Sequence, residues 1–281
     1  MFSCKAHASG ASSQSDPTAT ITKTKLCEED TVAPYRPWKY IDWDSNWDLR
    51  EKKSSTNASA TESSGSVPGK TSSSTNGNHV VHQIVLIRHG QYDMSHKADE
   101  LRVLTTLGRQ QAELTGARLR ELLDGHKIYP PKTVYYSTMQ RATETYNIIK
   151  PYLPAMAQHC LKPCSMITEG AVARPEPPKP RWQPSDESFA KDGLRVEAAF
   201  AQYFHRADER ETDSYSTVLV CHGNVIRYLV MRALQLPESA WLRTGVYNAS
   251  ITILEIQANG NVSLRCMSDA GHMPPSAITS N

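Results

Sequence analysis

The sequence lacks any long apolar run and any strong excess of one charge. No stretch reaches the roughly 18 consecutive apolar residues that a membrane-spanning helix needs. A net charge of +2 gives no reason to expect binding to nucleic acid or to an anionic surface. The start of the chain also lacks the apolar segment of a secretory signal peptide. These absences argue against a membrane-spanning, a secreted and a nucleic-acid-binding protein.

The chain is also poor in cysteine, and its six cysteines are scattered. Cys160 and Cys164 form a Cys-x3-Cys pair, but no second pair of cysteines or histidines stands at ligand spacing. A structural zinc site takes four such ligands, so we expect no metal at this pair. The sequence therefore predicts ordinary thiols in a reducing compartment.

Aliphatic residues are nearly absent from the first part of the chain. Residues 1–78 contain long Ser/Thr/Asn/Gly tracts, above all between 54 and 78. Such a segment cannot bury enough apolar surface to offset its conformational entropy. We therefore predict a low-complexity, disordered tail at 1–78 and one folded domain at 79–281, a comfortable size for a single α/β domain.

One island in the tail departs from this composition. Residues 38–48 carry three tryptophans among several aspartates. Tryptophan supplies a large contact area at little entropic cost and is common at interface hot spots. Two interpretations stay open: the island docks on the chain's own domain, or it reaches another subunit through the serine-rich linker that follows it.

From residue 79 onward, apolar runs alternate with amphipathic segments. The pattern predicts strands at 82–88, 133–137 and around 218–220. It predicts helices from 106 onward and at 139–152, 189–207 and 224–234. The chain closes with a predicted hairpin of strands at 250–257 and 262–267. Alternating strands and helices of this kind form a three-layer αβα sandwich around a mixed, mainly parallel sheet. The fold class is therefore α/β.

Two of the predicted strands end in the same way. The run at 84–87 leads into Arg-His-Gly with its histidine at His89, and the run at 218–220 leads into Cys-His-Gly with its histidine at His222. Ligands of parallel α/β sheets bind beyond the carboxyl ends of the strands. We therefore expect both imidazoles in one pocket.

A third motif adds positive charge to this pocket. Ser-x-Met-x-Arg-Ala-x-Glu-Thr at 137–145 places Arg141 in the first turn of a predicted helix, at the end of a strand. Two arginines, Arg88 and Arg141, would then join two histidines and a helix N-terminus at one point. That set of groups is typical of a phosphate-binding site.

Such a site can transfer a phosphoryl group. One histidine attacks phosphorus as a neutral imidazole, and the other stabilises the transition state together with the arginines. An alkoxide leaving group needs a proton, and the acid that we expect to supply it is Glu169. Glu176 and Glu187 stand in nearby loop sequence as alternatives. Four other histidines are interpreted as surface or packing residues: His79, His82, His205 and His272. Arg102 and Arg109 either border the pocket or, as we expect, lie on a solvated helix face.

These motifs resemble the histidine phosphatase superfamily, which includes the phosphoglycerate mutases. Further peptides are similar to a mitochondrial serine/threonine phosphatase branch of that family: Trp-Asp-x-Asn-Trp-Asp at 43–48, Asp-Gly-x-Arg at 192–195 and Asn-Val-Ile-Arg-Tyr at 224–228. The resemblance implies a phosphoglycerate mutase-like fold and a phosphoprotein phosphatase that works through a phosphohistidine intermediate.

The resemblance also implies a role for each motif residue. His89 corresponds to the phosphohistidine nucleophile and Glu169 to the proton donor. His222 takes part in catalysis and, with Arg88 and Arg141, in phosphate binding. No cofactor and no metal are expected, because the arginines carry the charge that Mg²⁺ carries in other phosphoryl-transfer enzymes.

Assembly and location follow from the same resemblance. It implies a homo-oligomer, a dimer or higher, held by an assembly peptide of Trp43, Asp44, Asn46, Trp47 and Asp48. It implies a mitochondrial protein whose relatives are anchored in the outer membrane. No spanning segment is visible in this sequence, so a cytosolic location stays open as an alternative.

Two alternatives of function also stay open. The first is a phosphoglycerate mutase or small-molecule phosphatase, although the mutase-type stretch with paired asparagines and Gly-Trp is missing between Gln91 and Leu104. The second is an oligomeric interaction scaffold that uses the tryptophan island. Substrates that are phosphoproteins, including phosphohistidine proteins, agree with the short, open mouth that this sequence predicts.

Overall fold

The structure, a computed structural model, describes residues 42–50, 80–155, 157 and 161–280. Six strands form one mixed sheet in the order β3-β2-β4-β1-β5-β6. Their bounds are β1 His82–Arg88, β2 Pro131–Ser137, β3 Leu161–Cys164, β4 Tyr215–Cys221, β5 Ile251–Ile256 and β6 Val262–Asp269. The first four strands run parallel, and β5 runs antiparallel to β1 and β6.

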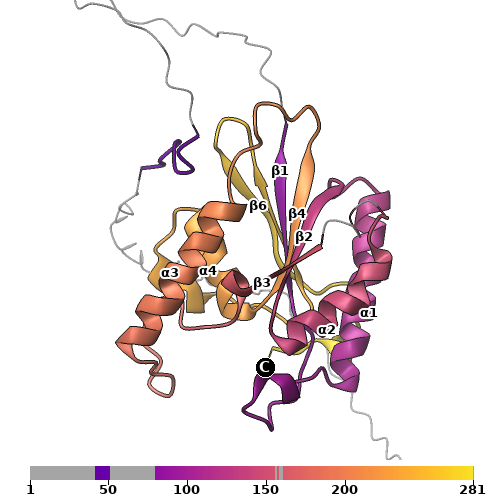
Figure 1. The fold of residues 1–281 in the computed structure, drawn as a ribbon, viewed down its shortest axis with the longest axis vertical. Coiled ribbons are helices and arrows are strands. Elements are labelled where there is room, and N and C mark those ends of the chain that lie inside the picture. The colour runs from indigo at the N-terminus through magenta and orange to yellow at the C-terminus, as the bar shows by residue number, and fades with distance from the viewer. Residues whose placement is uncertain (1–41, 51–79, 156, 158–160, 281) are drawn as a thin grey trace, which may run out of the picture. The chain divides into compact units, whose positions relative to one another are not determined.

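Helices cover both faces of the sheet. Their bounds are α1 Thr106–Asp124, α2 Gln140–Ile149, α3 Asp186–Tyr203 and α4 Gly223–Ala233. Figure 1 shows α1 and α2 on one side of the sheet and α3 and α4 on the other. The predicted three-layer αβα sandwich with a mainly parallel sheet is confirmed.

The core is divided between the two faces by the alternation of β1. Ile84 and Leu86 pack in the cluster on the α3/α4 side, whereas Val85 and Ile87 pack on the α1/α2 side. Successive strand side chains point to opposite faces, so a strand covered on both faces must be apolar throughout. Each fully buried aliphatic side chain contributes about 1.5–3 kcal/mol. This core holds the C-terminal end of β1 in place.

The closing hairpin is confirmed as β5 and β6. Its turn contains Gly260 with φ +86°, a conformation that favours glycine, and Gly260 N donates to the carbonyl of Gln257 at 2.9 Å. Helix α3 begins earlier than predicted, because the Ser185 side chain accepts a hydrogen bond from Ser188 N at 3.2 Å. The edge strand β3 was not predicted; its Pro163 is tolerated at a sheet edge.

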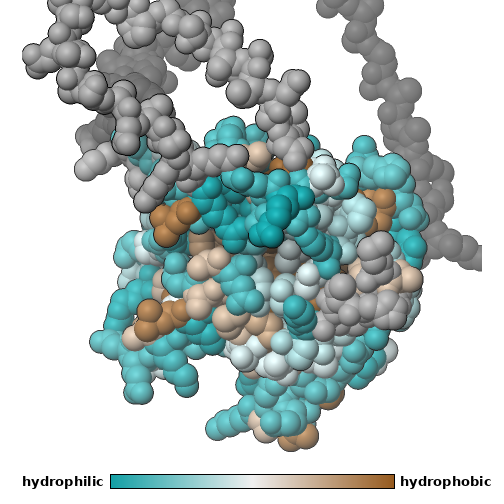
Figure 2. Space-filling model, turned by 45° about the horizontal axis from the view of Figure 1, so that its top comes forward, coloured by the Kyte–Doolittle hydropathy of each residue, from teal (hydrophilic) through white to brown (hydrophobic). Residues whose placement is uncertain are grey.

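Three observations describe the surface and the thiols. Figure 2 shows a mostly hydrophilic face with hydrophobic side chains in small, separate patches. Among the residues that the structure describes, no helix is long and apolar enough to cross a membrane. Cys164, Cys221 and Cys266 are free thiols. The remaining cysteines lie outside the described residues: Cys4, Cys27 and Cys160.

Residues 42–50 contact the domain of their own chain. The Trp47 ring packs on Phe200 with 5.6 Å between centroids, and its Nε1 donates to the Gly260 carbonyl at 2.7 Å. Asp48 accepts hydrogen bonds from Arg206 Nη2 at 2.7 Å and from Arg206 Nε at 3.0 Å. This is the self-docking interpretation of the tryptophan island, of which residues 38–41 lie outside the described part.

The same residues make further contacts that a subunit interface would have to preserve or replace. Asp44 N donates to Gln235 Oε1 at 2.9 Å, and Gln235 Nε2 donates back to the Asp44 carbonyl at 2.8 Å. Trp43 is 39% exposed, and Asn46 N donates to the Asp44 carboxylate at 2.9 Å. A role of these residues in assembly stays a prediction.

We predict that Asp48→Asn destabilises the protein by about 1–3 kcal/mol, because it removes a charged partner from the largely buried Arg206. Burial opposes ionisation of Asp48, but the hydrogen bonds and charge of Arg206 outweigh it, so the pKa of Asp48 is lowered. The stabilisation is therefore present above pH ~4 and is lost as pH falls through the lowered pKa. Urea unfolding at neutral pH measures the effect. Equal stability of Asp48→Asn and of the control Asp44→Asn would contradict it.

Candidate active site

The two histidines meet at the carboxyl ends of adjacent strands. Strands β1 and β4 are paired in parallel with Arg88 opposite Cys221, so the next residues, His89 and His222, emerge side by side. Their ring centroids lie 5.1 Å apart, and both side chains are buried. The structure therefore brings together the two imidazoles that the sequence predicts to share a pocket.

The orientation of His89 leaves one ring nitrogen for chemistry. Its Nδ1 lies 2.8 Å from the carbonyl oxygen of Gly90. A carbonyl only accepts, so Nδ1 carries the proton and Nε2 carries the lone pair. Arg141 Nε donates to this Nε2 at 3.3 Å. The nitrogen of His89 that carries the lone pair is therefore Nε2, and it lies beside a guanidinium.

A serine sets the tautomer of His222. Ser137 Oγ accepts a hydrogen bond from Met139 N at 3.3 Å and lies 2.7 Å from His222 Nε2. We assign the serine hydroxyl as the donor to Nε2, because no other acceptor for its proton is found in the described part of the chain, and the His222 proton is then on Nδ1. This buried Nδ1 has no hydrogen-bond partner among the described residues. It is available to donate to a phosphate oxygen.

Two arginines bring positive charge to the same point. Arg88 is buried at the end of β1, where its Nη1 donates to the Val246 carbonyl at 2.6 Å, and burial lowers its pKa to about 10. It therefore remains a cation at neutral pH. Arg141 is 2% exposed in the first turn of α2. A phosphate dianion would neutralise both charges.

Burial and the two arginines keep both histidines neutral. Burial first, and then the charges of Arg88 and Arg141, hold the pKa of His89 well below its usual range. The pKa of His222 is lowered by burial first, then by His89 and by the same two arginines. A neutral imidazole retains the lone pair that a nucleophile needs. His89 can therefore attack phosphorus across the physiological pH range.

The pKa of Glu169 is shifted in the opposite direction, upwards. Burial raises its pKa, although hydrogen bonds from Gly170 N and Asn224 N partly offset the effect. Gly170 N lies 3.2 Å from Oε1, and Asn224 N, in the first turn of α4, lies 3.4 Å from Oε2. A carboxyl group with a raised pKa can hold a proton for a leaving group.

A clamp from α3 positions the loop that carries Glu169. Arg195 donates to the carbonyls of Met166 and Thr168, both at 2.7 Å, and to Asp192 at 3.0 Å. A Cβ at Gly170 would lie 2.4 Å from the Asp192 carboxylate, so a larger residue here would have to displace the Asp192–Arg195 pair. The 192–195 peptide, seen in the sequence as part of the resemblance, therefore holds the loop of Glu169 in place.

A cavity of about 340 Å³ forms the mouth of this site, and its lining includes Arg102, Arg141, Glu169, Trp182 and Asn224. Arg102 precedes α1 and lines the mouth, so the solvated helix face that we expected for it is wrong and the alternative, a residue at the border of the pocket, is correct. Arg109, by contrast, is half-exposed and pairs with Glu144 at 2.8 Å.

The alternative acids lie elsewhere. Glu176 and Glu187 are exposed and are absent from the lining of the mouth. Within the part of the chain that the structure describes, no group of three or more His, Cys, Asp or Glu side chains could hold a metal ion.

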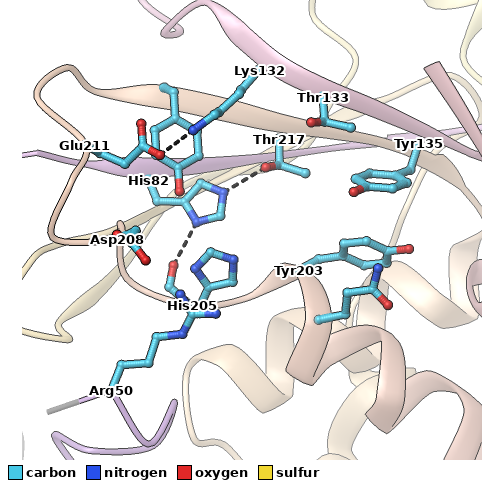
Figure 3. A pocket seen from close by; sticks show the side chains of 12 residues that line it. Arg50, His82, Lys132, Thr133, Tyr135, Tyr203, His205, Asp208, Glu211 and Thr217 are labelled. Carbon is cyan, nitrogen blue, oxygen red and sulfur yellow. Dashed lines mark hydrogen bonds and ion pairs between the residues drawn. The ribbon is translucent and has the colours of Figure 1, made fainter. Parts of the chain in front are cut away.

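A second group of histidines lies near the start of β1 and β4 and forms a hydrogen-bonded packing cluster (Figure 3). His82 Nδ1 lies 2.7 Å from the His205 carbonyl, and His82 Nε2 lies 2.8 Å from Thr217 Oγ1. Burial lowers the pKa of His82 to about 4. Both ring nitrogens are engaged, which confirms His82 as a packing residue; His79 lies outside the described residues.

Comparison with known proteins identifies the family. The model of the histidine phosphatase superfamily (branch 1) matches residues 84–269. The chain belongs to the histidine phosphatase superfamily. Serine/threonine-protein phosphatase PGAM5, mitochondrial, from Xenopus tropicalis is 44% identical over 93% of this chain and 91% of its own length. The human protein of the same name is 42% identical over 84% of this chain and 80% of its own length.

A solved structure shares the fold of this histidine phosphatase. The product of open reading frame Rv3214 from Mycobacterium tuberculosis is 26% identical and covers 68% of this chain and 99% of its own, with a TM-score of 0.52. The family, together with relatives at 42–44% identity that are named serine/threonine-protein phosphatases, indicates that the protein is a hydrolase. The resemblance that the sequence motifs predict is therefore confirmed.

We predict that Ser137→Ala lowers the turnover of this histidine phosphatase about tenfold. The variant removes the proton donor that sets the His222 tautomer, and a buried hydrogen bond is worth about 1–2 kcal/mol. Steady-state hydrolysis of p-nitrophenyl phosphate measures the change, with the exposed Ser276→Ala as control. Wild-type turnover in Ser137→Ala would show that the serine does not act on His222.

Proposed function

We propose that this histidine phosphatase hydrolyses phosphoserine and phosphothreonine in proteins through a phosphohistidine formed on His89. The observation that carries the proposal is the pair of neutral, buried imidazoles with opposite tautomers beside Arg88 and Arg141. The relatives that share 42–44% of their residues with it are named serine/threonine-protein phosphatases. Phosphohistidine in proteins is a second substrate of the same chemistry.

In the first step, His89 Nε2 attacks phosphorus with its lone pair, and the bond from phosphorus to the ester oxygen breaks. Glu169 gives its proton to the departing oxygen, which leaves as serine or threonine hydroxyl. His222 Nδ1 and the two arginines donate to the equatorial oxygens, where charge is highest in the transition state. The products are the free hydroxyl, a phosphohistidine at 89 and a Glu169 carboxylate.

In the second step, water attacks the phosphohistidine. The Glu169 carboxylate takes the proton of the attacking water, and the bond from phosphorus to His89 Nε2 breaks. Inorganic phosphate leaves, His89 regains its lone pair and Glu169 is again protonated. The cycle is balanced without any external proton donor.

Assembly and location belong to the same proposal. The relatives are named mitochondrial, which supports a mitochondrial location for this chain. We infer a tail at 1–78, a catalytic domain at 79–281, and a homo-oligomer in which Trp43, Trp47 and their neighbours take part. The exposed Trp43 leaves apolar surface for a second subunit while Asp48 holds the segment on its own domain.

We predict that His89→Ala abolishes phosphate release from a phosphoserine peptide, with a loss of at least about 10³-fold, because the nucleophile is gone. The folded state is checked by circular dichroism, and His96→Ala, an exposed histidine of the following loop, serves as control. Retained activity in His89→Ala, or efficient interconversion of phosphoglycerates by the wild type, would overturn the proposal.

We predict that Glu169→Gln slows hydrolysis of a phosphoserine peptide by roughly 10²–10⁴-fold. The effect on the first turnover of p-nitrophenyl phosphate, seen as the burst of nitrophenolate, is far smaller, because nitrophenolate leaves without a proton and the base role of Glu169 comes only in the second step. In the wild type, the rate of peptide hydrolysis falls as pH rises through the raised pKa of Glu169, since the acid must be protonated. The rate of the variant does not show this fall. First-turnover rates on both substrates across pH measure it; an equal loss of both first-turnover rates would exclude Glu169 as the acid.

A further inference from the structure

Arg141 already holds an anion, and that anion comes from the same chain. Asp99 Oδ1 lies 3.0 Å from Arg141 Nη1, and Asp99 Oδ2 accepts a hydrogen bond from Gln140 N at 2.9 Å. Helix α2 has no capping bond from its own N-cap side chain, Met139. The Asp99 carboxylate thus occupies a cation and a helix N-terminus, the two features that favour a bound anion.

We propose that Asp99 is an internal competitor of phosphate for Arg141, which weakens the hold of the pocket on the phosphate group. The proposal rests on the proposed function, because it concerns the phosphate that His89 receives. It makes Asp99, which the sequence did not single out, a residue that sets oxyanion affinity.

The contacts of Arg141 show why the two anions compete. Its Nε faces His89 Nε2 at 3.3 Å, its Nη1 faces Asp99, and its Nη2 faces the Met139 sulfur at 3.5 Å. A phosphoryl group on His89 Nε2 must therefore accept from the guanidinium that Asp99 already neutralises. The Tyr92 ring, 4.7 Å from Arg141 Cζ, covers one face of the guanidinium and limits its movement.

Competition has a catalytic use. Two buried arginines and a donor histidine would bind inorganic phosphate tightly, and a product that leaves slowly limits turnover. A carboxylate next to the site repels the phosphate dianion, because like charges within a few ångströms in a partly dry pocket disfavour each other. Asp99 is only partly buried, with 33% of its side chain exposed, so it can turn towards water when phosphate arrives.

A merely structural role of Asp99 makes the opposite prediction. If the carboxylate only caps α2 and aims Arg141, then its removal loosens the arginine and weakens oxyanion binding. If it competes, removal of its charge tightens oxyanion binding. The sign of the change therefore separates the two roles.

The test is the affinity of the full chain for inorganic phosphate and for orthovanadate, measured by calorimetry and as inhibition of p-nitrophenyl phosphate hydrolysis. We expect Asp99→Asn to bind both anions roughly fivefold or more tightly than the wild type. Asp93→Asn is the matched control, because Asp93 lies in the same loop and contacts Ser95 and His96. This control should leave both affinities unchanged.

A second variant, Asp99→Ser, repeats the test in case Asp99→Asn does not fold. Asp99→Ser is uncharged and retains a hydroxyl that can accept from a backbone amide, and it should tighten binding in the same direction. Unchanged or weaker binding in the folded variants would overturn the competitor role while His89-dependent hydrolysis persists. Loss of the proposed function shows itself separately, as activity that survives His89→Ala.

Discussion

The hydrogen bond between His89 Nδ1 and the Gly90 carbonyl is the interaction on which the site depends. It places the proton on the inner nitrogen and turns the lone pair of Nε2 towards the pocket. The hydrogen bond from the Ser137 hydroxyl to His222 Nε2 has the opposite effect. It places the His222 proton on Nδ1, which can then donate a hydrogen bond. One ring can therefore receive a phosphoryl group while the other grips its oxygens, although the residue type is the same.

Backbone packing around Gly90 keeps this geometry. A side chain at Gly90 would lie 2.4 Å from the carbonyl oxygen of Gly108, so the turn after β1 closes against the start of α1 only with glycine. Thr145 Oγ1 accepts from Gly90 N at 3.0 Å, and Ala249 N donates to the His89 carbonyl at 3.1 Å. Helices α1 and α2 and the turn just before β5 thus all fix one tight turn. Burial, needed for this packing, also keeps the imidazoles neutral.

Periodicity and residue type predict those parts of the fold that local rules govern. The apolar run before His89 predicts a buried strand because β1 is covered on both faces, and the two His-Gly motifs meet because parallel strands align their carboxyl ends. The edge strand β3, which contains Pro163, could not be predicted from the sequence, because its pairing depends on β2 and not on its own residues. Asp99 could not be predicted as a site residue for the same reason. The sequence around an acidic loop residue does not show that its side chain contacts an arginine from a distant part of the chain.

The central claim is that Nε2 of His89 carries the phosphoryl group during turnover. The direct measurement is an alkaline denaturing quench during hydrolysis of a phosphoserine peptide, followed by peptide mapping and phosphorus NMR of the labelled fragment. We expect phosphate on residue 89, bonded to Nε2. Phosphate on Nδ1, on His222, or on no histidine at all would contradict the mechanism.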